Sequence, residues 1–157
     1  MGNYNVRQLK NLRKQIISAA EAGAFDMASW AYQNQECRTT YCAAGLVVIS
    51  NGWEISWSPG ATEILPGRGR TSYMCTKEGE DADEIARVAS DILGLGYFER
   101  EALFHALGPE DDQDIEASEV IRVLDALIKR AELGMEHAVG EEGDDTRQAL
   151  LYWHATV

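Results

Sequence analysis

One segment of the sequence is apolar nearly all the way round a helix: Tyr41-Cys42-Ala43-Ala44-Gly45-Leu46-Val47-Val48-Ile49. Thr39 and Thr40 precede it and are suited to cap a helix start, while Asn51-Gly52 follows it and is suited to end one. The segment therefore predicts a fully buried helix, although its valines are also compatible with a strand.

Apolar residues at helical spacing predict further helices on both sides of this segment. Leu9, Leu12 and Ile16, for example, recur on one face of a stretch that Gly23 is suited to end. The expected helices are residues 5–22, a helix from Asp81 or Asp83 to Gly94, residues 98–107, a helix ending near Leu133, and a last helix that Asp144 or Asp145 can cap.

Two short segments instead alternate between apolar and polar residues. Residues 53–57 and 71–76 have this period of two, and the stretch between them contains Pro59, Gly60, Pro66 and Gly67. They predict a small hairpin with a long loop, and residues 25–36 are expected to form a short helical turn and a loop. The predicted fold is mainly α: a single acidic helical domain over residues 1–157, with five or six helices and one small β-hairpin.

Length and composition exclude several classes of protein. The chain has 157 residues, of which 45% are hydrophobic, so one domain can bury a core without disulfides or metal. No run of about 18 apolar residues suggests a membrane span, and the start of the sequence does not resemble a signal peptide. Three cysteines are too few, and odd in number, for a cross-linked secreted scaffold. We therefore expect a cytoplasmic protein with no membrane contact.

Negative charge is concentrated in the last third of the sequence. The net charge is −12, and residues 109–157 contribute −9 because they contain 13 acidic and 4 basic residues. A surface this negative repels phosphate backbones, so direct binding of nucleic acid is not expected, and a basic protein surface is a better partner. Solubility alone could also account for the charge.

Cys37 and Cys42 flank a threonine-rich turn before the apolar helix, and three interpretations of them stay open. The thiols can be buried packing material at the start of the helix. They can join Cys75 and one histidine (His105, His137 or His154) in a Cys3His zinc site. Alternatively, Cys42 can be a nucleophile activated by the helix start, with His105 as its base.

The cysteine segment also carries a resemblance. The sequence has Met27-x-x-Trp30, then Cys37-x-Thr39-x-x-Cys42-x-Ala44-Gly45, and later Leu93-Gly94-Leu95 with Leu103-Phe104. This order resembles a family of small, functionally uncharacterised bacterial and phage proteins whose pattern is Cys-Gly-Thr-x-x-Cys-x-x-Gly. Arg38 stands where the family usually has glycine. The resemblance implies a mainly helical single domain in a phage or prophage and implies no particular activity.

Signatures of common catalytic sites, such as Walker, His-Glu-x-x-His and Gly-x-Ser-x-Gly motifs, are absent from the sequence. The sequence therefore predicts a non-catalytic module, with no cofactor, that binds a protein partner through acidic residues. The candidate binding residues are Asp111, Asp112, Asp114 and Glu116. A cysteine-dependent enzyme using Cys42 and a zinc protein using Cys37, Cys42 and Cys75 are the alternatives.

Overall fold

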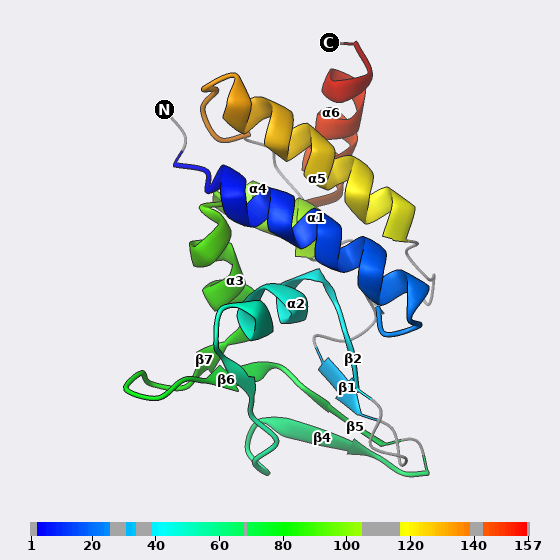
Figure 1. The fold of residues 1–157 in the computed structure, drawn as a ribbon, viewed down its shortest axis with the longest axis vertical. Coiled ribbons are helices and arrows are strands. Elements are labelled where there is room, and N and C mark those ends of the chain that lie inside the picture. The colour runs from blue at the N-terminus through cyan, green and yellow to red at the C-terminus, as the bar shows by residue number, and fades with distance from the viewer. Residues whose placement is uncertain are drawn as a thin grey trace.

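A computed structural model describes residues 3–25, 31–33, 39–67, 69–104, 117–138 and 143–156. These residues form six helices, which fill the upper part of Figure 1, and short strands, which fill the lower part. The helices are α1 (Val6–Glu21), α2 (Ala43–Ser50), α3 (Ile85–Leu93), α4 (Tyr97–Phe104), α5 (Ala117–Glu132) and α6 (Gly143–Thr156). The strands are β1 (Ala31–Gln33), β2 (Thr39–Tyr41), β3 (Glu54–Ile55), β4 (Thr62–Leu65), β5 (Gly69–Ser72), β6 (Met74–Thr76) and β7 (Asp83–Glu84).

The mainly α architecture is confirmed, and α1 and α5 follow the predicted pattern closely. The side chain of Asn5 accepts a hydrogen bond from the Gln8 amide at the start of α1, and the helix ends just before Gly23. Its buried residues are Leu9, Leu12 and Ile16. Helical spacing thus predicted both the extent of α1 and the face that it buries.

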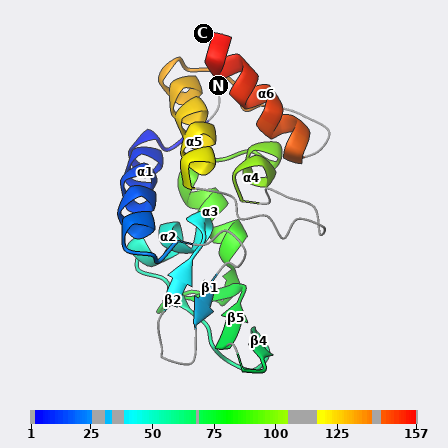
Figure 2. The same ribbon diagram turned by 90° about the vertical axis from the view of Figure 1, so that its right-hand side faces the viewer.

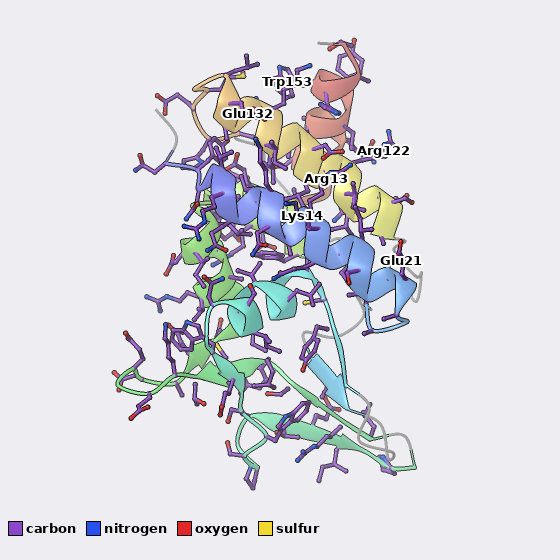
Figure 3. All side chains as sticks on the ribbon, in the orientation of Figure 1. Arg13, Lys14, Glu21, Arg122, Glu132 and Trp153 are labelled. Carbon is purple, nitrogen blue, oxygen red and sulfur yellow. The ribbon has the colours of Figure 1, made fainter. Side chains whose placement is uncertain are left out.

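Charged pairs fix α1 against α5 outside this apolar seam. Arg13 Nε donates to Asp125 Oδ1 at 2.7 Å, and Lys10 Nζ lies 3.7 Å from Glu132 Oε2. The earlier residue of α1, Lys10, pairs with the later residue of α5, Glu132, so the two helices run antiparallel. Figure 3 shows Arg13 on α1 beside α5, which carries Arg122 and Glu132.

The apolar segment forms the helix α2, as predicted, but the helix is not fully buried, because Ile49 near its end is exposed. Ala43, Ala44, Gly45, Val47 and Val48 are all buried there. All of these except Gly45 belong to one hydrophobic cluster that also includes buried residues of α1, α3, α4, α5 and α6. Among the described residues, no helix has both the length and the apolarity needed to cross a bilayer.

The strand content is larger than one hairpin. The strands form a four-stranded sheet in the order β2-β1-β5-β4 and a three-stranded sheet in the order β3-β6-β7, with every pair antiparallel. The predicted pairing of residues 53–57 with 71–76 is present where Ile55 pairs with Cys75. The expected loop between these segments, however, contains β4, and Ala31–Gln33 forms β1 where a loop was expected. Residues 26–30 and 34–38 lie outside the described residues.

Three predicted helix starts were also wrong. Thr39 and Thr40 belong to β2, and Cys42 is the N-cap of α2 instead. The third helix begins at Ile85 with Glu84 as its N-cap, because residues 83–84 pair with β6 as a short strand. The last helix begins at Gly143, so Asp144 and Asp145 lie within its first turn. In the first two cases, antiparallel pairing with the preceding strand, β1 or β6, takes up the residues that capping rules would have used.

Helix α6 starts beside α4 and ends beside the C-terminal end of α5, as Figure 2 shows. Near its start, the buried Arg147 donates through Nε and one terminal nitrogen to the carbonyl oxygen of Ala102 on α4. Near its end, the ring of Trp153 lies beneath the Arg130 guanidinium of α5, 5.3 Å from ring centroid to Cζ. The helices α5 and α6 therefore converge at their C-terminal ends.

The turn after α3 brings the chain close to the segment before α1. Gly94 ends α3 with φ of 70°, and the Asn5 amide donates to the Leu93 carbonyl oxygen at 2.9 Å. A Cβ atom at position 94 would overlap the backbone carbonyl oxygen of Asn3. Glycine is thus required both for its left-handed conformation and for the close approach.

We predict that Gly94→Ala lowers the free energy of unfolding by about 2 kcal/mol more than Gly23→Ala does, because only the first substitution also overpacks. Gly23 is the matched control, since it has the same φ of 70° and a Cβ atom added there would meet nothing within 4 Å. Urea denaturation measures both values. Equal losses would contradict a close contact at Gly94.

Candidate functional site

Most of the residues that sequence analysis singled out for binding or catalysis lie outside the described part of the chain. These are Asp111, Asp112, Asp114, Glu116, Cys37 and His105. Their proposed roles therefore stay predictions. The structure does place Cys42 and Cys75, together with His137 and His154, which were candidates for the fourth zinc ligand.

Both described cysteines are in the hydrophobic core. Cys42 is 1% exposed, and Cys75 is fully buried on β6, where its thiol donates to the Asp83 carbonyl oxygen at 3.6 Å. Burial, with a smaller contribution from the charge of Asp83, raises the pKa of Cys75 to about 11. A thiol that stays protonated and shielded from water is a poor nucleophile. Among the described residues, no three His, Cys, Asp or Glu side chains are grouped so that they could hold a metal ion.

A polar cluster that sequence analysis did not identify is centred on Glu99. Glu99 is the third residue of α4, and its side chain is completely buried. The carboxylate turns back so that Oε1 accepts a hydrogen bond from the Gly96 amide at 2.9 Å. This is the glutamate half of a capping box, and the positive end of the helix favours a carboxylate there.

Three further donors come from distant parts of the chain. His137 Nδ1 lies 2.6 Å from Oε1, the Ala138 amide donates to Oε2 at 3.1 Å, and the Tyr4 hydroxyl donates to Oε2. Each carboxylate oxygen thus accepts two hydrogen bonds, which uses the usual capacity of an ionised carboxylate. Burying a charge in this way is tolerated only when such bonds replace water.

The electrostatics of the cluster keep Tyr4 as a donor. Burial, the hydrogen bond to Glu99 and the charge of Glu99 raise the pKa of Tyr4, while Arg130 acts in the opposite direction. Arg130 also donates to the Glu136 carbonyl oxygen at 2.7 Å. That bond holds the backbone of the loop immediately before His137.

The cluster fixes the orientation of the His137 ring. The ring packs edge-on against Tyr4 with their centroids 4.7 Å apart, and a Cβ atom at Gly96 would lie 3.2 Å from His137 Cβ and Cγ. Since both Glu99 oxygens act as acceptors, Nδ1 must carry the hydrogen, which leaves the lone pair of the neutral ring on Nε2. The His137 side chain is 35% exposed, and Nε2 has no hydrogen-bond partner among the described residues.

A carboxylate-oriented imidazole can act as a base or a nucleophile, or it can serve only to join segments of the chain. Sequence analysis considered His137 only as one of three possible zinc ligands and did not consider Tyr4 or Glu99. The spacing Gly96-x-x-Glu99 before an apolar helix was the available local signal. No family model, curated protein or solved structure matches this chain.

We predict that Glu99→Gln lowers the free energy of unfolding by about 3 kcal/mol, because the new amide group places a donor opposite other donors in a buried site. Glu132→Gln removes the same charge from a side chain that is 53% exposed and should change stability by less than about 1 kcal/mol. Urea denaturation compares the two variants. Similar losses would show that Glu99 does not depend on its buried partners.

We also predict that iodoacetamide labels Cys42 and Cys75 slowly in the folded protein at about pH 8 and rapidly once urea is added. The reason is burial for both thiols and, for Cys75, the raised pKa in addition. Peptide mapping by mass spectrometry measures labelling at each position. Rapid labelling of Cys42 in the native protein below about pH 7 would contradict this prediction and favour the nucleophile.

Proposed function

We propose that this protein is a non-catalytic module that binds a protein partner with a basic surface. The resemblance of the Cys37–Gly45 segment to small bacterial and phage proteins supports an accessory role in a phage or prophage. The proposed contact is the acidic segment that contains Asp111, Asp112, Asp114 and Glu116.

The distribution of charge around α5 and α6 is the observation that carries the proposal. Residues 117–138 and 146–156 are balanced, with four acidic and four basic residues. The other nine acidic residues of the last third lie in 110–116 and 141–145, where no lysine or arginine occurs. Residues 110–116 immediately precede α5, which begins at Ala117. Residues 141–145 include the first residues of α6, which begins at Gly143. The charge is therefore grouped by position and is not spread evenly over the helices.

Part of this grouping favours the helices themselves, because carboxylates near a helix N-terminus are stabilised by about 0.3–1 kcal/mol. One or two such residues are enough for that purpose, since the effect falls off within the first turn. A run with five acidic residues in 110–116 exceeds that need. Grouped charge of one sign raises the rate of association with an oppositely charged protein and makes the rate sensitive to salt.

The burial of Cys42 supports this proposal over a cysteine-dependent enzyme. An enzyme that uses Cys42, with or without His105, needs a thiolate that substrate can reach, whereas Cys42 is 1% exposed. For a zinc protein that uses Cys37, Cys42 and Cys75, the structure describes Cys42 and Cys75, and Cys37 lies outside the described residues.

We predict that reversing Asp111, Asp112, Asp114 and Glu116 to lysine abolishes salt-sensitive capture of a basic protein from a host lysate. The matched control reverses four exposed glutamates elsewhere: Glu21, Glu54, Glu63 and Glu80. Each reversal adds two charges, so both variants change the net charge from −12 to −4. The control should retain the partner of the original protein.

Quantitative mass spectrometry of the captured proteins over a series of salt concentrations makes the comparison, and circular dichroism checks that both variants fold. Equal loss in both variants would show that only net charge matters. Retention of the same partner by the variant reversed at 111–116, or the absence of basic proteins among those captured by the original protein, would contradict the proposed function.

A further inference from the structure

We propose that His137 is a modification site: its Nε2 atom is a nucleophile that accepts a phosphoryl group from a phosphoramidate donor, and Glu99 is the positioning residue. The proposal rests on the 2.6 Å contact between His137 Nδ1 and the fully buried carboxylate of Glu99. The other ring nitrogen, Nε2, has no hydrogen-bond partner among the described residues. The acidic residues in 110–116 and 141–145 are not needed for this reaction, so the proposal is independent of the proposed function.

The contact first fixes which nitrogen reacts. Nδ1 is held as the donor to Glu99, so the lone pair is on Nε2 in the neutral ring. The ring is also held in place by Tyr4, which packs against it, and by Gly96, which leaves room for it. A reacting atom on a fixed ring needs less reorganisation than one on a freely rotating side chain.

The buried carboxylate also stabilises the product. The Nε2 lone pair attacks phosphorus, a new N–P bond forms, the P–N bond of the donor breaks, and ammonia leaves. The ring then carries a positive charge, because it keeps its hydrogen on Nδ1 while Nε2 is phosphorylated. Glu99 lies in hydrogen-bond contact with that hydrogen and has no access to water, so its charge compensates the ring directly.

Within the described part of the chain, polar and charged groups from three segments lie around the ring of His137. The Tyr4 hydroxyl donates to Glu99, and Arg130 places a cation next to the Glu136 carbonyl oxygen, one residue before His137. Glu136, the residue before His137, is acidic and exposed.

His154 provides an internal comparison. It lies on α6 beside Trp153, with 6.4 Å between the ring centroids, and the buried Nδ1 atom of His154 has no partner among the described residues. No carboxylate contacts it among those residues. If a carboxylate is what makes an imidazole reactive in this protein, His137 and His154 should differ in rate.

The test incubates the folded protein with potassium phosphoramidate and maps phosphorylated peptides by mass spectrometry under non-acidic conditions. We expect His137 to be modified at least about tenfold faster than His154, and we expect urea to abolish the difference. Heteronuclear NMR should identify Nε2 as the phosphorylated atom. Glu99→Gln should slow modification of His137 by about tenfold, and Glu132→Gln should leave the rate unchanged.

The proposal is overturned if His137 and His154 react at similar rates, if Nδ1 is the phosphorylated atom, or if a folded Glu99→Gln variant reacts as fast as the original protein. If Glu99→Gln does not fold, the ratio of the two histidine rates in the original protein decides the matter, since that ratio needs no variant. His137→Gln confirms the assignment of the modified peptide, because its loss of label leaves labelling of His154 intact.

Discussion

A carboxylate without access to water has to obtain all its hydrogen bonds from the protein, and Glu99 obtains them from three separate parts of the chain. The segment before α1 contributes Tyr4, the turn before α4 contributes the Gly96 amide, and the loop after α5 contributes His137 and the Ala138 amide. An uncompensated charge at this depth would cost several kcal/mol. The position of each segment is therefore constrained by the same two oxygen atoms.

The helices were predictable because their signal is local. In α1, α2 and α5, either the spacing of apolar residues or their continuity determines which face is buried, and those residues are neighbours in sequence. The strands were less predictable, because β1 is only three residues long and is defined by its partners β2 and β5. The pairing of β1 with β5 joins Ala31 to Ser72, which lie far apart in the sequence, and short-range periodicity does not detect such a pairing.

The Glu99 cluster could not have been inferred from composition or periodicity. A glutamate in the first turn of an amphipathic helix usually faces solvent, and both Tyr4 and His137 lie outside helices. What distinguishes Glu99 is burial, which depends on the packing of α4 against other elements. The Gly96-x-x-Glu99 spacing is typical of a capped helix start, but it carries no information about the donors from distant parts of the chain. The acidic residues predicted to bind a partner were identifiable from charge alone, and they lie outside the described residues.

The short helix α4 has a further consequence for how the chain folds. It has eight residues, fewer than the about 12–15 that an isolated helix needs to be even marginally stable in water. Its bonds to Tyr4 and to Arg147 span 95 and 45 residues along the sequence, so large loops must close before either bond can form. Formation of α4 therefore depends on contacts with distant segments, as does the association of α1 with α5, where Arg13 and Asp125 are 112 residues apart. Once formed, α4 links the segment before α1 and the start of α6 into one cooperative unit.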